Sequence, residues 1–280
     1  MQEKEKREVD YGEDHKVTVR NDFVTAAYPK DITAADLKLL RLVISQCRKN
    51  DTEFYEYTFK VQDIAEMFGV NKSNMYRVAH ETALRLFNCN LKLEDGKRYK
   101  LIHILQTAEY DSGAFTLQLS GETAKLFLRL QRDFTNIPLL PILAMKNKSS
   151  IRIYELICQK FIGHYPYADY ATEVQLTTNE IRKVTETEKQ KSYDHIGHFK
   201  ARIFRPAIEE IEKAAGWKII QHDLKKGRAV IGFRLEVWSR NGWEYIEDCK
   251  EKGILPNRGK YGNDDGQVPG QMTFADYFKQ

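Results

Sequence analysis

The chain repeats one order of predicted elements twice, and this duplication constrains its fold more than any single motif. Each copy has a helix, a short helix, a long amphipathic helix and a β-hairpin with Lys and Arg at its turn. The first copy contains TAADLKLLRLVISQ, VQDIAEMFGV, KSNMYRVAHETALRLF and LKLEDGKRYKLIHIL. The second contains KSSIRIYELICQKF, LTTNEIRKVTE, YDHIGHFKARIFRPAIEEIEKAAG and WKIIQHDLKKGRAVIGFRLEV. The pattern predicts two related α+β domains.

Local signals in the first copy agree with one small nucleic-acid-binding fold, the winged helix. Thr33 and Asp36 have the spacing of a capping box at the start of the first helix. Gly69 stops a helix of two turns and a longer helix follows, which is the helix-turn-helix order. Asp95-Gly96 then separates two alternating strands, as in a tight hairpin. We therefore predict two tandem winged-helix domains.

The second copy differs in its long helix, which is predicted from near Tyr193 to Ala215 and is ended by Gly216. Pro206 lies in the middle of this helix and removes one backbone hydrogen bond, so it should bend the helix or mark a new helical start. The hairpin that follows carries the KKGR sequence at its turn.

Composition divides the chain into five regions. Residues 1–16 have mixed charge and few apolar side chains, so we expect a mobile tail. The winged-helix domains are predicted over residues 17–137 and 148–240, and the duplication favours two small cores over one large core. Residues 138–147 are predicted to be an extended apolar connector, because Pro138 and Pro141 are not expected inside a helix. Residues 241–280 form a C-terminal extension.

The charge of the chain is distributed unevenly. The whole chain has 44 Lys+Arg against 40 Asp+Glu, but residues 148–240 have 17 against 12, a net charge of +5. Clustered cations drive binding to the phosphate backbone through counterion release. The second copy is therefore favoured as the half that faces phosphate, although a solvated surface can carry the same excess.

The sequence gives no signal for a metal, a cofactor or a membrane. Cys47, Cys89, Cys158 and Cys249 lie far apart with no C-x-x-C pair, so no metal site and no cofactor are expected. The N-terminus is charged from its third residue and contains no apolar segment, unlike a signal peptide or membrane anchor. We expect a soluble cytoplasmic protein.

The second copy resembles the iteron-binding initiators of plasmid replication, of the RepE, RepA and π type. The resemblance is carried by KNKSSIRIYELI, by FKARIFRPAIEEIEK, and by LKKGR followed by FRLEV. It implies two winged-helix domains that bind repeated origin DNA and promote opening of an adjacent AT-rich segment. It also implies recruitment of a host initiator and the replicative helicase, and repression of the protein's own gene by a dimer.

Recognition of DNA needs outward residues that hydrogen-bond base edges or neutralise phosphates. In the second copy, the residues early in the long helix are expected to reach bases, and those after them to contact bases or phosphates. The alternative is a solvated helix face; the resemblance favours DNA contact. The helix candidates are Lys191, Ser192, Tyr193, His195, His198, Lys200, Arg202 and Arg205. The hairpin candidates are Lys225, Lys226 and Arg228, although charged hairpin tips also serve solubility.

The first copy has its own candidates and a competing role. Its helix candidates are Lys72, Ser73, Asn74 and Arg77, and its hairpin candidates are Lys97, Arg98 and Lys100. The resemblance attaches dimerisation chiefly to this domain. Both roles are compatible, because a switch between monomer and dimer changes how DNA is engaged.

A short peptide near the C-terminus follows a polar, Gly-rich linker. A Gln and spaced apolar residues on such a tether suit docking into a hydrophobic pocket. The peptide resembles a sliding-clamp-binding motif, and docking back onto the chain's own domain is the alternative. Its anchors are Gln271, Met272, Phe274, Tyr277 and Phe278.

Catalytic interpretations are disfavoured. His195-Ile-Gly-His198 matches the HIGH sequence of class I aminoacyl-tRNA synthetases, but no βαβ pattern precedes it. There is no His-x-His pair for a rolling-circle nickase and no P-loop for ATP-driven melting. The sequence therefore predicts a DNA-binding replication initiator that is not an enzyme. A tandem winged-helix transcription regulator without origin function is the alternative, and it is more often associated with inverted than with direct repeats.

Overall fold

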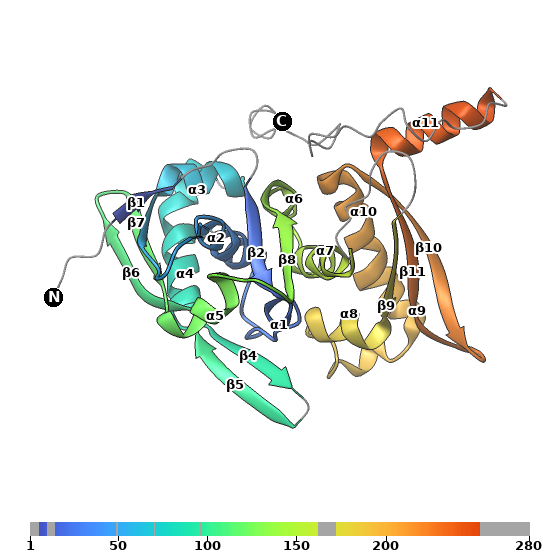
Figure 1. Cartoon of the computed structure of the whole chain (residues 1–280), viewed down its shortest axis with the longest axis horizontal. Helices are drawn as coiled ribbons and strands as arrows, with labels where there is room; N and C mark the ends of the chain where they lie inside the picture. Colours follow the sequence, from blue (N-terminus) through green and yellow to red (C-terminus); the bar gives the residue numbers. More distant parts are fainter. Residues whose placement is uncertain are drawn as a thin grey trace.

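A computed structural model describes residues 6–9, 15–48, 50–69, 71–95, 97–161 and 172–252. The turn residue Gly96 and the C-terminal peptide 271–278 lie outside the described residues. Figure 1 shows two halves side by side, with the helix α7 (Lys148–Lys160) between them. The hairpins β4–β5 and β10–β11 both project toward the lower side of this view.

The first half contains a four-stranded sheet in the order β1-β3-β7-β6 and two separate two-stranded sheets, β2-β8 and β4-β5. Its elements are β1 (Lys6–Glu8), β2 (Lys16–Arg20), α1 (Asn21–Val24), α2 (Ala34–Ser45), β3 (Glu56–Lys60), α3 (Val61–Phe68), η1 (Lys72–Asn74), α4 (Met75–Phe87), β4 (Asn90–Asp95), β5 (Arg98–His103), β6 (Leu105–Asp111), β7 (Ala114–Leu119), η2 (Gly121–Thr123), α5 (Ala124–Phe127), β8 (Phe134–Pro138) and α6 (Leu139–Ala144).

The predicted local signals of the first half are confirmed. The Thr33 hydroxyl accepts a hydrogen bond from the Asp36 backbone N–H, and an Asp36 carboxylate oxygen accepts one from the Thr33 N–H, which completes the capping box. Gly69 ends α3 in the left-handed conformation, with φ of 64°, which glycine adopts without steric cost. The strands β4 and β5 pair as the predicted hairpin.

The second half consists of helices packed on a three-stranded antiparallel sheet in the order β10-β11-β9. Its elements after α7 are β9 (Thr172–Thr177), α8 (Thr178–Val184), η3 (Lys191–Tyr193), α9 (Ile196–Phe199), η4 (Lys200–Phe204), α10 (Arg205–Ala215), β10 (Trp217–Lys226), β11 (Ala229–Ser239) and α11 (Arg240–Glu251). At Gly232 of β11, a Cβ would lie 2.5 Å from the Leu176 carbonyl oxygen of β9, so the close pairing of these strands requires glycine.

The helix α10 begins at Arg205, one residue before Pro206, where the sequence predicted a bend or a new helical start. One π-helical turn, η4, stands directly before Pro206, which lies in the first turn of α10. The proline ring has no N–H to continue the α-helical ladder, and the wider turn accommodates the ring. Gly216 then ends α10 with a φ of 64°.

Two of the predicted boundaries differ from the structure. Lys6–Glu8 is not a mobile tail, because it forms β1, which pairs in parallel with β3. The Arg7 guanidinium donates to both Asp51 carboxylate oxygens at 2.9 and 3.0 Å and lies over the Tyr55 ring, which offsets the cost of ordering the strand.

The connector is also not extended as predicted. Residues 139–144 form α6, with Pro141 as its third residue. Proline is tolerated there because the N–H groups of a first helical turn have no intrahelical acceptor. Pro138 precedes the helix in extended conformation and ends β8, which pairs with β2.

The expectation of two separate small cores is wrong. One connected cluster of buried side chains, with members between Val17 and Val237, includes residues of both halves and of α7. A small satellite cluster surrounds Val61 and Phe115. The two winged helices therefore share one interior, and their relative position is set by close packing.

Candidate nucleic-acid interface

The segment from η3 to α10 is anchored to the sheet of the second half by its inner face. Phe199, Phe204 and Ile211 are buried, and the Phe204 ring stacks on Phe233 of β11 with ring centroids 4.0 Å apart. This packing leaves the opposite face of the segment exposed, as in a recognition helix.

Most of the predicted helix candidates lie on this exposed face. None of their side chains forms an ion pair within the described residues, so their charges and donors are available to a ligand. They are Lys191, Ser192, His195, His198, Arg202 and Arg205.

Two candidates are instead engaged inside the protein. The Lys200 ammonium binds both carboxylate oxygens of Asp223 on β10, at 2.7 and 3.0 Å, and lies 5.6 Å from the Phe233 ring centroid. Tyr193 is half-buried and packs edge-on against Phe199. These side chains hold the segment on the sheet, and a DNA contact by Lys200 requires its ion pair to open.

Arg182 of α8 was not among the sequence candidates, but it organises the approach to this segment. Its Nη2 donates to the Thr187 and Glu188 carbonyl oxygens and, at 2.9 Å, to the Asp194 carboxylate. These bonds tie the loop after α8 to the start of the exposed segment. A basic residue in the last turn of α8, just before a polar loop, was the available sequence signal.

The hairpin of the second half forms an exposed cationic tip. Gly227 adopts a left-handed φ of 61° at the turn between β10 and β11. Lys225, Lys226 and Arg228 around it are exposed and form no ion pair within the described part of the chain. Three uncompensated cations on a projecting hairpin suit contact with a phosphate backbone.

The first half has fewer free cations on its equivalent surfaces. Ser73 and Asn74 are exposed on η1, whereas the side chain of Lys72 lies outside the described set. Arg77 is exposed on α4 but pairs with Glu81 at 2.9 Å. Lys97 and Arg98 are exposed at the β4–β5 hairpin.

Two other cations of the first half are already compensated. On β5, the Lys100 ammonium pairs with Glu122 at 2.7 Å. On α4, the Arg85 guanidinium binds both carboxylate oxygens of the buried Asp36, at 2.8 and 3.0 Å, and so joins α4 to α2. Among the predicted candidates of this half, those at the hairpin tip and on η1 therefore have no ion pair within the described residues.

The outward side of α4 also carries apolar side chains. Leu84 is 48% exposed and Phe87 is 40% exposed, and Tyr99 and Leu101 are exposed on β5. Exposed apolar groups of this kind are typical of protein contacts rather than phosphate contacts.

Among the described residues, no cluster of His, Cys, Asp or Glu is arranged to hold a metal ion. No helix within the described ranges is long and apolar enough to cross a membrane.

The fold and the exposed cations of the second half define a tandem winged-helix protein of the nucleic-acid-binding class. Two family models match the chain: "Initiator Replication protein, WH1" over residues 16–158 and "Initiator Rep protein, WH2" over residues 177–237. The chain belongs to this family of replication initiators. The first match extends to residue 158 and thus contains most of α7, at whose start the second domain was predicted to begin.

A solved structure agrees with this fold. The chain is similar to the Pi initiator protein in a crystal structure with iteron DNA, with 16% identity, a TM-score of 0.63, and coverage of 80% of this chain and 97% of that chain. It is also similar to domains 2 and 3 of RctB, with 10% identity, a TM-score of 0.45, and coverage of 77% and 86%. A comparison with curated proteins finds no match.

Proposed function

We propose that this initiator binds repeated duplex DNA, the iterons, at a replication origin, with its second half as the principal reader. The observation that carries the proposal is the set of uncompensated cations on two adjoining elements. Arg202 and Arg205 lie on the exposed face of the η3–α10 segment, and Lys225, Lys226 and Arg228 lie on the hairpin. A helix of this kind reads base edges in the major groove, and the hairpin cations bind phosphates or the minor groove.

The proposal extends to origin opening and to partners. Binding at several adjacent repeats concentrates deformation on an AT-rich segment, whose melting admits the host initiator and the replicative helicase. These partners rest on the family resemblance. The peptide containing Gln271, Phe274 and Tyr277 remains a proposed clamp-binding site and lies outside the described residues.

We assign self-association to the first half. Leu84 and Phe87 on α4 are exposed, and β6, next to α4, is an edge strand of the four-stranded sheet. An exposed edge strand beside apolar side chains supports pairing with a second copy. The dimer then represses the protein's own gene and the monomer binds the repeats.

The test is a titration of the full chain with duplex DNA from its own origin. Direct repeats spaced by about two helical turns should bind at least a hundredfold more tightly than the same bases in shuffled order. Equal affinity for both duplexes would refute the proposal. Preference for an inverted repeat, together with replication of a plasmid that lacks the gene, would indicate a transcription regulator.

A further inference from the structure

The two halves meet at a buried cluster of charged side chains. Arg152 and Glu155 lie on α7 and Arg41 lies on α2, and the exposed fractions of their side chains are 0%, 1% and 0%. The Arg41 guanidinium donates to both Glu155 carboxylate oxygens, at 2.5 and 2.9 Å, and Arg152 donates to Glu155 at 2.7 Å. One carboxylate is therefore shared by two guanidinium groups.

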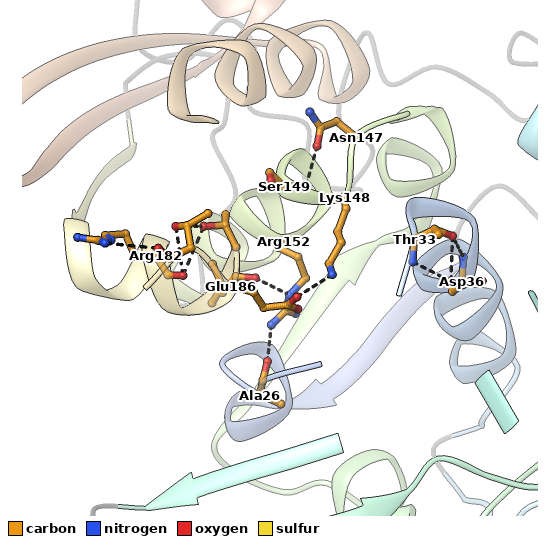
Figure 2. A network of polar contacts seen from close by, with 12 residues as sticks. Ala26, Thr33, Asp36, Asn147, Lys148, Ser149, Arg152, Arg182 and Glu186 are labelled. Carbon is orange, nitrogen blue, oxygen red and sulfur yellow. Dashed lines mark hydrogen bonds and ion pairs between the residues drawn. The ribbon is translucent and has the colours of Figure 1, made fainter. Parts of the chain in front are cut away.

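Arg152 also bonds the backbone of both halves. Its Nη2 donates to the carbonyl oxygens of Val24 and Ala26 in the first half, both at 2.8 Å. Its Nε donates to the Val184 carbonyl oxygen at the end of α8 in the second half, at 3.3 Å. Figure 2 shows Arg152 reaching from α7 to Ala26, with the Lys148–Glu186 ion pair nearby. One planar guanidinium thus binds three backbone carbonyl oxygens, two in the first half and one in the second.

The cluster has one more cation than anion. Burial alone raises the pKa of Glu155, but the Arg41 and Arg152 guanidiniums outweigh burial and hold this pKa below its ordinary value. Burial raises the pKa of Tyr28, which accepts a bond from Arg41, to about 12, so Tyr28 stays a neutral phenol. A buried excess charge is a poor source of stability, and such groups are better explained by the geometry they impose.

Short connections link this cluster to both DNA-facing regions. Ala27, next to Ala26, exchanges two backbone hydrogen bonds with Lys92 of β4, each 3.1 Å long. The strand β4 belongs to the hairpin of the first half. On the other side, Val184 is the last residue of α8, the same helix whose Arg182 binds Asp194 at the start of the recognition segment. Lys183 of α8 also lies 3.7 Å from Glu94 of β4.

We propose that Arg152 is a positioning residue that fixes the separation and rotation between the β4–β5 hairpin and the recognition segment, so that one molecule accepts only one spacing of its two contacts on a duplex. This inference rests on the proposed DNA-binding function. Each added base pair moves one contact by about 3.4 Å along the duplex and rotates it by roughly 35°. A rigid pair of readers cannot follow such a shift.

The chain provides a test variant and a matched control. Arg152→Met removes the three backbone bonds but leaves the Arg41–Glu155 pair electrically balanced, so the buried excess charge disappears. Lys160→Met removes a different ion pair from the same helix: the Lys160 ammonium binds Glu180 of α8 at 2.6 Å on a partly exposed surface. Arg152→Lys keeps the positive charge but lacks the planar set of donors of a guanidinium. Circular dichroism shows whether Arg152→Met folds. If it does not fold, Arg152→Lys replaces it in both measurements.

The first readout needs no DNA. Spin labels are attached to non-native amino acids at positions 97 and 226. Double electron–electron resonance then measures the distance between the two hairpins. We expect one narrow distance distribution in the unsubstituted chain and in Lys160→Met, and a distribution at least twice as wide in the Arg152 variant. Equal widths in all three proteins would overturn the inference, whatever the outcome with DNA.

The second readout uses origin repeats with one or two base pairs inserted between the two tracts protected in a hydroxyl-radical footprint. The unsubstituted chain and Lys160→Met should lose about tenfold or more in affinity on insertion, and the Arg152 variant should lose no more than about threefold. The same steep loss in the Arg152 variant would contradict the inference. Failure of the unsubstituted chain to prefer any repeat would instead contradict the proposed function, and the resonance result would stand by itself.

Discussion

The two halves use one scaffold with different outward surfaces. On α4 of the first half, Arg77 is paired with Glu81, and Leu84 and Phe87 are exposed. On the corresponding segment of the second half, Arg202 and Arg205 are exposed without an ion pair within the described residues. The apolar positions that face inward are the shared part of the pattern. The comparison supports the proposed division of roles, in which the first half provides the main protein contact and the second half the main DNA contact.

The largest expected effect tests whether the halves are energetically separate. Glu155→Gln leaves two buried guanidiniums without their counter-charge, and we expect the free energy of unfolding to fall by about 3–5 kcal/mol. Both halves should unfold in one transition because they share a core. Urea unfolding followed by tryptophan fluorescence and circular dichroism checks this. Two separate transitions, with only one of them shifted, would contradict the shared interior.

A buried lysine at the contact between the halves is expected to make the free energy of unfolding depend on pH. Lys38 of α2 is 4% exposed and lies near Phe68, Lys146 and Glu210 of α10. Burial, more than the neighbouring Lys146, lowers the pKa of Lys38 to about 8, and Glu210 opposes this shift.

The direction of this pH dependence follows from the number of protons that the folded and unfolded chains bind. Between pH 8 and about 10.5 the unfolded chain keeps the Lys38 proton that the folded chain has released, so stability rises with pH. Relative to Lys38→Met, the free energy of unfolding should rise by about 3 kcal/mol across this window. Denaturant titrations of both proteins at pH 7, 9 and 10.5 measure the difference. A difference that is constant with pH would show that Lys38 titrates normally.

Arginine variants on the two long helices sharpen the comparison directly. Arg202→Ala should weaken specific binding by about 1–3 kcal/mol and nonspecific binding much less. Arg77→Ala, at an exposed but ion-paired position, should change either affinity by less than about 0.5 kcal/mol. Fluorescence anisotropy with repeat and shuffled duplexes provides both affinities. Equal losses for the two variants would remove the proposed division of work.

A smaller effect is expected on self-association. Leu84→Glu places a charge on the apolar side of α4 and should raise the dimer dissociation constant about tenfold, or about 1.4 kcal/mol. Ile231→Glu is the matched control, because Ile231 is 45% exposed on β11 of the second half. Analytical ultracentrifugation distinguishes the variants. If Ile231→Glu has the larger effect, the dimer surface lies in the second half.

The sequence predicted the features that depend on neighbouring residues. The capping box at Thr33, the glycines at the ends of α3 and α10, and the new helical start at Pro206 are local, and all are present. The ordered β1 depends on Asp51 and Tyr55, which lie far along the chain, and the sequence prediction missed it. The helix that contains Pro141 was missed because proline is compatible both with the first turn of a helix and with an extended segment. The sequence around Pro141 did not distinguish these two conformations.

The candidate site was predictable to a similar degree. Periodicity placed Arg202 and Arg205 outward, but it gave no indication that Lys200 would find Asp223 on a strand that follows the helix. The role of Arg152 was hidden for the same reason, since its partners are backbone carbonyl groups of two segments far from it in sequence, Val24 with Ala26 and Val184. Side-chain roles that join distant segments require the fold.

The central claim is that the second half is the principal DNA reader, and paired hairpin variants test it most directly. Lys225→Ala with Lys226→Ala, and Lys97→Ala with Arg98→Ala, each remove two exposed cations, one pair from each half. Affinity for the origin repeats is measured as a function of salt. We predict that the second-half pair lowers the salt slope by about 2 and that the first-half pair lowers it by less than about 1. An equal or larger loss for the first-half pair would contradict the account.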